Sequence, residues 1–258
     1  MITKNEINSV KSLHKKKDRN NSELFIAEGS KLVIDLINSG GKIKQIFAIK
    51  EWIDENNDFL KLDANLITQI SHSEMERITG LAAASPVLCV FYQQKNSDLS
   101  ILLTENIPIL VLEDIRDPGN MGTIIRTADW FGVKNIVCSI NTVDCYNSKV
   151  IQSTMGSINR VSIYYTNIVE FLKLLPENRT KVGTFLEGKL LSETKMPLNS
   201  VIIIGNEAHG ISQEVENMLN IKTLIPGIKA YKKVEGAESL NASIATSIVL
   251  YEYFMQQR

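Results

Sequence analysis

The stretch "IPILVLEDIRDPGNMGTIIRTADWFGV", residues 107–133, indicates the fold class. It opens on a near-continuous apolar run, which is typical of a strand buried on both faces of a parallel sheet. A Pro-Gly turn follows, and apolar residues then recur at the spacing of a helix. A buried strand that leads through a tight turn into a helix is the repeating unit of an α/β protein.

The C-terminal half of the sequence repeats this unit. Helical patterns separate most of its apolar runs, so the alternation predicts a mostly parallel sheet covered on both faces. In such a sheet, ligands bind at the carboxyl ends of the strands. Further strands are expected in "NIVCSI" (135–140), "RVSIYY" (160–165), "KVGTFL" (181–186), "VIIIG" (201–205) and "IKTLIPG" (221–227).

Residues 1–95 alternate shorter helix and strand patterns, which predicts a small α/β unit of their own. The polar stretch "QKNSDLS" (94–100) follows and is the best linker candidate. We therefore predict a domain over 1–95, a linker over 96–106 and a second α/β domain over 107–258.

The composition is that of a soluble globular protein, with 44% apolar and 22% charged residues. No apolar run approaches the ~18 residues of a membrane span, and the N-terminus has no apolar signal segment, so a cytoplasmic protein is expected. Cys89 and Cys138 lie in apolar runs and are expected to be buried free thiols; with Cys145 and only three histidines, no metal-ligand spacing occurs.

Charge is close to balanced, at −1 overall, but two clusters are basic. They are "HKKKDR" (14–19) and "KAYKK" (229–233). Such runs are usually solvated faces, and contact with nucleic acid is the alternative.

The loop "DPGNMGTIIRTADWFG" (117–132) contains two candidate functional residues. Asn120 is a candidate helix cap. Arg126 has two explanations: a surface salt bridge to Asp129, or a phosphate contact, for which its rigid fork is suited.

The loop "VIIIGNEAHGIS" (201–212) follows another buried strand. Taken alone, Glu207 is an ordinary solvated carboxylate and His209 an exposed bystander. The sequence contains neither the GxGxxG fingerprint nor the Walker pattern, which disfavours a nucleotide-dependent oxidoreductase on a Rossmann sheet.

The stretch "EGAESLNASIATSIVLYEYF" (235–254) runs from polar residues into a helix, with Ser239 or Asn241 as the expected cap. The recurrence of Ile244, Ile248, Tyr251 and Met255 predicts that helix. All three loops follow strands of one predicted sheet, so their polar residues are expected to converge.

Together, "NMGTIIRTADWFGV", "IIIGNEAHGIS" and "IPGIKAYKKVEGAESLNASIATSIVLYEY" resemble motifs one, two and three of the SpoU (TrmH-type) RNA ribose 2′-O-methyltransferases of the SPOUT superfamily. The resemblance covers residues 107–256. "SLHKKKDRNNSELFIAEGSKLV" is similar to the opening of the substrate-binding domain of many members. Its closing "LAAASPVLCVF" departs from the Pro-x-Gly pattern expected there.

The resemblance implies a C-terminal trefoil knot, S-adenosylmethionine bound in the knot, and a homodimer whose two subunits form the active site. It implies RNA as the partner, with large-subunit (23S) rRNA favoured over tRNA, and no metal. The implied catalytic residues are Arg126, Asn120, Glu207, Ser239 and Asn241; the cofactor contacts are Thr184, Gly205, Ile225 and Leu240; the RNA contacts are Lys15, Lys16, Lys17, Arg19 and Lys232, with Tyr231 as a stacking candidate.

The implied reaction is attack of a ribose 2′-hydroxyl on the methyl group of the cofactor. Arg126 is often given the role of base in this family. An arginine with a pKa above about 12 is a poor base, so a phosphate clamp that stabilises the forming alkoxide is the preferred role. A tRNA methyltransferase and a non-catalytic RNA-binding or ribosome-assembly protein on the same fold are the alternatives.

Overall fold

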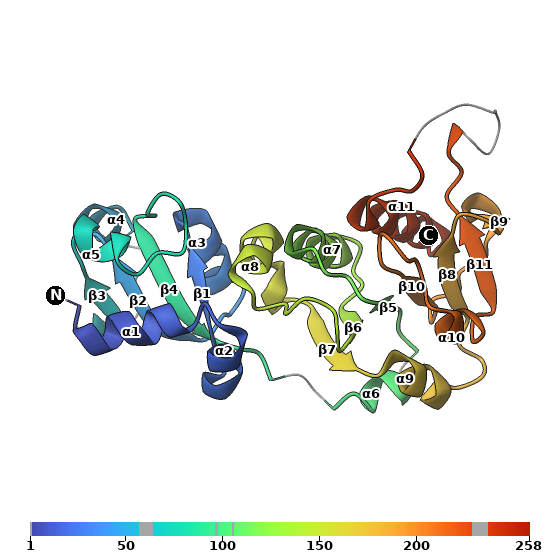
Figure 1. The fold of residues 1–258 in the computed structure, drawn as a ribbon, viewed down its shortest axis with the longest axis horizontal. Coiled ribbons are helices and arrows are strands. Elements are labelled where there is room, and N and C mark those ends of the chain that lie inside the picture. The colour runs from blue at the N-terminus through green and yellow to red at the C-terminus, as the bar shows by residue number, and fades with distance from the viewer. Residues whose placement is uncertain (1, 57–63, 96–97, 105, 229–236) are drawn as a thin grey trace. The chain divides into compact units, whose positions relative to one another are not determined.

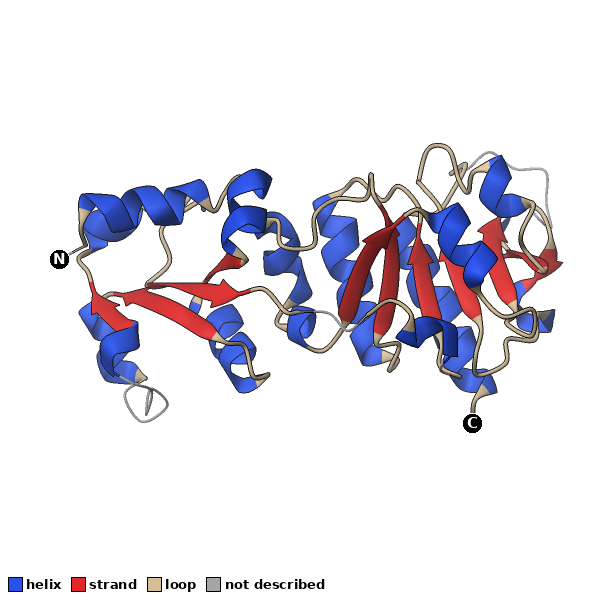
Figure 2. Cartoon of the chain, turned by 90° about the horizontal axis from the view of Figure 1, so that it is seen from below, coloured by secondary structure: helices blue, strands red, loops and turns tan. Residues whose placement is uncertain are grey.

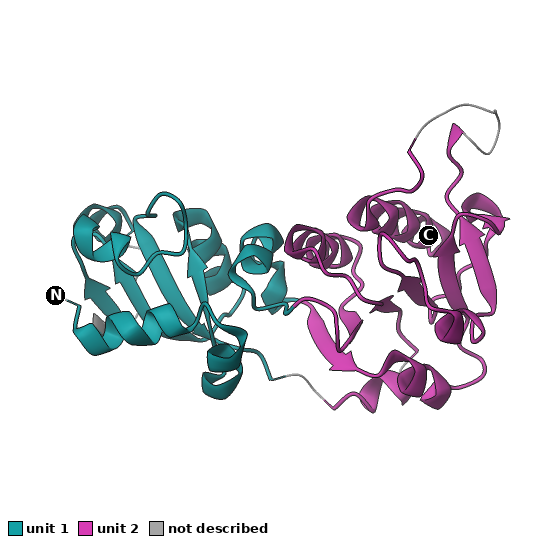
Figure 3. Ribbon diagram, viewed as in Figure 1, with its two compact units in different colours: residues 1–95, 144–160 teal, residues 96–143, 161–258 magenta. Residues whose placement is uncertain are grey.

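The structure is a computed structural model that describes residues 2–56, 64–95, 98–104, 106–228 and 237–258. The chain folds into two compact units, coloured separately in Figure 3. Unit one comprises residues 1–95 and 144–160, and unit two comprises residues 96–143 and 161–258.

Unit one is built on a four-stranded sheet with the order β1-β4-β2-β3. β4 pairs antiparallel with β1 and β2, and β2 pairs parallel with β3. Its elements are α1 (Lys4–Ser12), α2 (Lys16–Ser22), β1 (Leu24–Glu28), α3 (Ser30–Asn38), β2 (Ile43–Ala48), α4 (Lys50–Glu55), η1 (Ala64–Leu66), β3 (Ile67–Gln69), α5 (His72–Glu76), β4 (Val87–Tyr92), α8 (Ser148–Thr154) and η2 (Ser157–Asn159).

Residues 144–160 belong to unit one, which differs from the predicted boundary because the prediction assigned 107–258 to one domain. The helix α8 of this segment buries Val150 and Ile151 completely. The Gln152 side chain donates to the backbone oxygen of Glu28 at 2.7 Å. The segment joins two strands of the other unit along the chain, so its sequence position gives no sign of where it packs.

Unit two is built on a seven-stranded sheet with the order β7-β6-β5-β10-β8-β11-β9, and every pairing in it is parallel. Figure 2 shows its strands side by side. Its elements are α6 (Ile101–Thr104), β5 (Ile109–Leu112), α7 (Pro118–Trp130), β6 (Asn135–Ser139), β7 (Ser162–Thr166), α9 (Ile168–Leu174), β8 (Lys181–Phe185), β9 (Lys189–Leu190), η3 (Leu191–Glu193), β10 (Val201–Ile204), α10 (Gln213–Glu216), β11 (Ile221–Leu224) and α11 (Ala242–Gln256). The predicted parallel α/β sheet is confirmed.

The two faces of this sheet carry different helices (Figure 1). Ile109, Val111 and Ile203 pack with α6, α9 and α10 in one core cluster. Alternate residues of the same strands, such as Leu110 and Ile202, point to the opposite face, because side chains alternate along a strand. α7 and α11 cover that face and pack against each other.

Part of the predicted linker is structured. Residues 101–104 form α6, and Leu102 is 1% exposed within the core of unit two. The polar composition of "QKNSDLS" therefore marks a turn that leads into a short helix, and the predicted linker over 96–106 is too long at its C-terminal end.

The α11 helix begins at an Asn241 cap, whose side-chain oxygen accepts the N–H groups of Ser243 and Ile244. Near its end, the Tyr253 hydroxyl donates to the Leu198 carbonyl at 2.8 Å, and burial raises the pKa of Tyr253 to about 12. Of the described helices, none is long and apolar enough to cross a membrane. All three cysteines are buried, and burial raises the pKa of the Cys89 thiol.

Candidate cofactor and catalytic site

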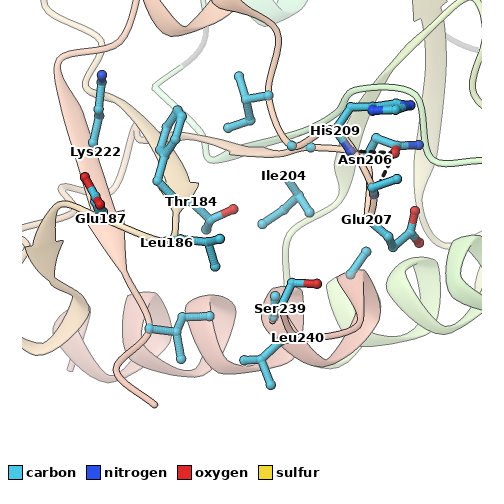
Figure 4. Close-up of a pocket in the computed structure, with 18 of the residues that line it drawn as sticks. Thr184, Leu186, Glu187, Ile204, Asn206, Glu207, His209, Lys222, Ser239 and Leu240 are labelled. Carbon is cyan, nitrogen blue, oxygen red and sulfur yellow. Dashed lines mark hydrogen bonds between the residues drawn. The ribbon is translucent and has the colours of Figure 1, made fainter. Parts of the chain in front are cut away.

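A cavity of about 990 Å³ opens in unit two at the carboxyl ends of β8, β10 and β11, beside the start of α11 (Figure 4). Figure 4 shows Thr184, Leu186 and Ile204 on one side of it and Ser239 with Leu240 on another. This is the edge of a parallel sheet where the loops of neighbouring strands meet, so ligand binding is expected there.

The four predicted cofactor residues all line this cavity. They are separated widely in the sequence, and three different strand ends and the loop before α11 supply them. The residues are Thr184, Gly205, Ile225 and Leu240. Two of the predicted catalytic residues, Glu207 and Ser239, line it as well.

A chain of hydrogen bonds joins the three polar loops. The Asn120 side-chain amide donates to Glu207 Oε1 at 2.5 Å, and the Asn241 amide donates to Asn120 Oδ1 at 2.8 Å. The other Asn241 atom, Oδ1, caps α11. Asn241 therefore caps the N-terminus of α11 and also fixes the side chain of Asn120.

The neighbours also fix which way each amide points. Glu207 is a carboxylate when ionised and can only accept, so the Asn120 atom that faces it must be the nitrogen. The Asn120 oxygen then faces Asn241, which must present its own nitrogen because its oxygen is occupied by backbone N–H groups. The helix cap thus fixes which atom donates and which accepts in both hydrogen bonds between Glu207, Asn120 and Asn241.

Asn120 is not the cap of α7, contrary to the local alternative that the sequence left open. Asp117 is the N-cap, and its carboxylate accepts the Asn120 backbone N–H at 2.7 Å. This leaves the Asn120 side chain available to Glu207 and Asn241.

Asn206 is a functional candidate that the sequence did not single out. Its Nδ2 donates to the Asp114 carbonyl at 2.8 Å, and its Oδ1 accepts the N–H groups of Ala208 and His209. Asn206 therefore links the loop after β10 to the loop after β5 and fixes the backbone next to Glu207. A polar residue at the end of a buried strand was the available signal.

His209 lies on the exposed rim of the cavity, and its backbone N–H is the group that is bonded. Lys222 pairs with Glu216 and lies 5.4 Å from the centre of the Phe185 ring. The remaining charged lining residues are Glu187 and Glu238. The wall therefore combines apolar surface with an excess of carboxylates, which suits a cation of nucleoside size better than an anion.

Arg126 is the one predicted catalytic residue that faces neither the cavity nor the hydrogen-bonded chain. It lies exposed on α7. Thr123 and Trp130 are exposed at three residues before and four after it, on the same side of the helix, and Trp130 is 83% exposed.

The predicted RNA contacts divide into three groups. Lys15, Lys16 and Lys17 are exposed around the start of α2. Arg19 is only 3% exposed, and its guanidinium bonds Asp144 at 2.5 Å and the Leu13 carbonyl at 2.9 Å, so its prediction as a surface phosphate contact is wrong. Lys232 and Tyr231 lie outside the described residues.

Gly205 leaves no room for a side chain. A Cβ atom on it would lie 2.3 Å from the carbonyl carbon of Gly210 and 2.5 Å from the nitrogen of Ile211. We expect Gly205→Ala to lower the free energy of unfolding by about 1–3 kcal/mol, because the backbone of Gly210 and Ile211 must shift to make room for the methyl group. Ligand affinity at the cavity should fall about tenfold, which corresponds to about 1.4 kcal/mol.

Urea unfolding and calorimetric titration with S-adenosylmethionine measure these two effects. Gly227→Ala is the matched control, since a Cβ there meets nothing within 4 Å. Equal stability and affinity for the two variants would show that the β10 end tolerates a side chain.

Comparisons with known proteins agree with this geometry. The SpoU rRNA Methylase family model matches residues 108–251, and an MRM3-like substrate binding domain model matches residues 4–89. Within the described residues, no cluster of three or more potential metal ligands occurs.

One relative is the 23S rRNA (guanosine(2553)-2′-O)-methyltransferase RlmP of Bacillus subtilis, which is 27% identical over 95% of this chain and 94% of its own. An AdoMet-bound rRNA methyltransferase from Sinorhizobium meliloti superposes with a TM-score of 0.84 at 28% identity, over 100% of this chain and 97% of its own. The SpoU methyltransferase AviRb of Streptomyces viridochromogenes, at 19% identity over 99% and 98% of the two chains, shares the fold with a TM-score of 0.82. Since the family model spans more than half of the sequence, the chain belongs to the SpoU rRNA methylase family.

Proposed function

We propose that this protein transfers a methyl group from S-adenosylmethionine to a ribose 2′-hydroxyl of RNA, with 23S rRNA as the favoured substrate. The observation that carries the proposal is the hydrogen-bonded chain Glu207–Asn120–Asn241 beside the cavity, because it joins one residue from each family motif. The 23S rRNA activity of the Bacillus subtilis relative, which matches over nearly the whole of both chains, supports the substrate class.

The cavity suits S-adenosylmethionine in volume and in chemistry. Its ~990 Å³ lies within the range of small-molecule sites. Ile225 and Leu240 offer apolar surface to a purine ring. Gly205 lets the backbone of Gly210 and Ile211 pack closely against the end of β10, which shapes this wall of the cavity. The bound cofactor supplies the activated methyl group. We propose that Thr184, Gly205, Ile225 and Leu240 hold it.

The polar residues then orient the ribose. A methyl transfer needs the attacking oxygen in line with the methyl carbon, so positioning supplies much of the rate. We assign this positioning to Asn120, Ser239 and Asn241, with Glu207 fixing Asn120. As the hydroxyl loses its proton, negative charge grows on its oxygen. Arg126 stabilises that charge and clamps the adjacent phosphate.

The test is methyl transfer from labelled S-adenosylmethionine to separate rRNA and tRNA pools from cells lacking the gene, followed by digestion to nucleosides. Label in a 2′-O-methyl nucleoside from rRNA is expected. Label from tRNA alone would replace the substrate class. No label from either pool or from assembled ribosomal subunits, with cofactor binding confirmed, would favour a non-catalytic RNA-binding protein.

The protein is proposed to act as a homodimer through α11 and α7. Four apolar residues of α11 are between 36% and 54% exposed and lie along one side of the helix: Ile244, Ile248, Tyr251 and Met255. The sequence predicted a helix from this same recurrence, and the stripe is its exposed side. Exposed apolar surface of this extent is typical of an interface. Arg126 and Trp130 lie on the exposed side of the adjoining α7, which supports an active site completed by Arg126 of a second copy.

Ile248→Glu should convert the dimer to a monomer, because a buried unpaired charge opposes association. Sedimentation equilibrium measures the state directly. Leu174→Glu is the matched control, since Leu174 is 64% exposed on α9, on the other face of the sheet. A dimer that survives Ile248→Glu, or is lost equally in both variants, would contradict this interface.

The trefoil knot of the family is also proposed for this chain. The sheet order places β10 between β5 and β8, and α11 packs against α7 and β10, which supports this proposal. We propose that the methylation of rRNA takes place in the cytoplasm and needs no metal ion.

A further inference from the structure

Glu28 is a buried carboxylate that the proposed chemistry does not use. It ends β1 in unit one and is 3% exposed. Within the described part of the chain, no lysine, arginine or histidine pairs with it. Burying a carboxylate without a countercharge is costly unless hydrogen bonds replace its water, so the bonds that it makes indicate its purpose.

Those bonds all go to one turn. Glu28 Oε1 accepts the Gly80 backbone N–H at 3.0 Å, and Oε2 accepts the Thr79 hydroxyl at 2.5 Å. Thr79 Oγ1 in turn accepts the Leu81 N–H at 3.1 Å. The carboxylate therefore fixes the backbone at the start of the loop that leads into β4.

The loop that Glu28 fixes contributes nothing to the core. Leu81, Ala82, Ala83 and Ala84 are all exposed. Within the described residues, no acceptor pairs with the backbone N–H groups of the three alanines. A buried carboxylate that orders an exposed loop of small side chains indicates that the conformation of this loop matters for binding a partner.

The same turn lies against the basic segment of unit one. A Cβ on Gly80 would be 2.4 Å from Cε1 of His14, so the His14 ring lies directly on Gly80. The next three residues along the chain are the exposed Lys15, Lys16 and Lys17. The His14–Gly80 contact joins the segment that carries these lysines to the turn that leads into residues 81–84, and the two exposed stretches on either side of the contact are called here the lysine–alanine face.

We infer that the lysine–alanine face binds the phosphate–ribose backbone of the substrate RNA and that Glu28 is the residue that positions it. The lysines neutralise phosphates. The alanines let RNA approach closely enough for their free N–H groups to donate to phosphate or ribose oxygens. This inference rests on the proposed function. Lys15, Lys16 and Lys17 lie in the stretch that resembles the family's domain, whereas residues 81–84 open "LAAASPVLCVF", where the sequence departs from the family pattern.

Binding of the full-length protein to unmodified 23S rRNA transcribed in vitro tests the face separately from methyl transfer. Ala83→Asp should weaken binding about tenfold by placing a negative charge against phosphate. Lys16→Ala should reduce the slope of log affinity against log salt by about one. Lys31→Glu, an exposed charge reversal on α3, is the control and should change affinity much less.

Glu28→Gln tests the positioning role. The two bonds go to different carboxylate oxygens, and the amide nitrogen that replaces one of them cannot accept, so either the Gly80 N–H or the Thr79 hydroxyl loses its acceptor. The substitution should raise KM for the transcript several-fold with kcat and S-adenosylmethionine affinity unchanged, and speed amide exchange of Gly80 and Leu81 about tenfold or more. Wild-type affinity in both Ala83→Asp and Lys16→Ala would overturn the inference, as would failure of the wild-type protein to bind the transcript. Binding without methylation would overturn the proposed function and leave this test valid.

Discussion

Arg126→Ala is expected to lower the rate of methyl transfer by about 10²–10³-fold, as loss of a preorganised charge at a developing oxyanion does. The fold and S-adenosylmethionine affinity should be unchanged, because Arg126 is exposed and does not line the cavity. Single-turnover kinetics measures the chemical step, and calorimetry with thermal unfolding measures the other two. Full activity in this variant would contradict the assignment.

Arg126→Lys separates charge from geometry. Lysine keeps the positive charge and loses the planar fork that pairs two oxygens at once. An activity between those of the wild type and Arg126→Ala is therefore expected. Activity equal to wild type would show that a point charge suffices and that Arg126 does not clamp a phosphate through two bonds.

Mixing two inactive variants shows which subunit supplies Arg126. In a heterodimer of Arg126→Ala with Asn120→Asp, one of the two sites is intact if Arg126 acts across the interface. After random exchange of subunits, activity should recover to about a quarter of the wild-type level, since heterodimers make up half of the population. No recovery, with heterodimers demonstrated, would place Arg126 and Asn120 of the same subunit in one site.

Asn120→Asp is expected to have the second largest effect, a loss of activity of about 10²-fold or more. The substitution places a carboxylate where an amide nitrogen now donates to Glu207 at 2.5 Å. Two facing carboxylates repel, and like charges at such distances cost several kcal/mol. Asn120→Ala removes the bond without the repulsion and should be less damaging, which steady-state kinetics of the two variants compares.

The pH dependence of the same variant follows from the repulsion. A neighbouring carboxylate raises the pKa of a carboxyl group, so one of the facing pair takes up a proton as the pH falls. The proton restores a hydrogen bond between them, and the relative activity of Asn120→Asp should therefore recover on acidification. A constant ratio to wild-type activity across pH would contradict the repulsion.

Adding Glu207→Gln to Asn120→Asp should restore much of the activity at neutral pH. The glutamine amide then donates to the new carboxylate, and the carboxylate still accepts from Asn241. The double variant reverses the direction of one hydrogen bond and keeps the chain complete. If the double variant is less active than Asn120→Asp, Glu207 has a role beyond holding Asn120.

The sequence predicted most of the second unit because its signals are local. The buried strands β5 and β10 are apolar throughout, and glycine or polar residues mark where they end. Parallel strands bring such ends to one edge, so Gly205 and Glu207 were predicted to converge with the loop before α11. The three motifs supplied the identity of the residues.

Local signals failed where a polar or charged residue serves a distant partner. The sequence places Arg19 in a basic surface run, yet its side chain is buried and paired with Asp144, which lies 125 positions away. The segment 144–160 lies between two strands of unit two along the chain and packs in unit one. Neither the pairing of Arg19 with Asp144 nor the packing of residues 144–160 in unit one can be predicted from the spacing or composition of the sequence.

The sequence by itself determined the α/β class and the parallel sheet, because strand and helix periodicity follow from which side chains must leave water. The predicted cofactor residues came from the resemblance of its three motifs to the family. Only the tertiary structure decided the direction of the Asn120 amide, the hydrogen bond between Asn206 and Asp114, and the bonds of Glu28 to Thr79 and Gly80. Each depends on where a donor or acceptor from a distant loop comes to lie. Hydrogen bonds require that position to within a few tenths of an ångström, and only the folded chain sets it.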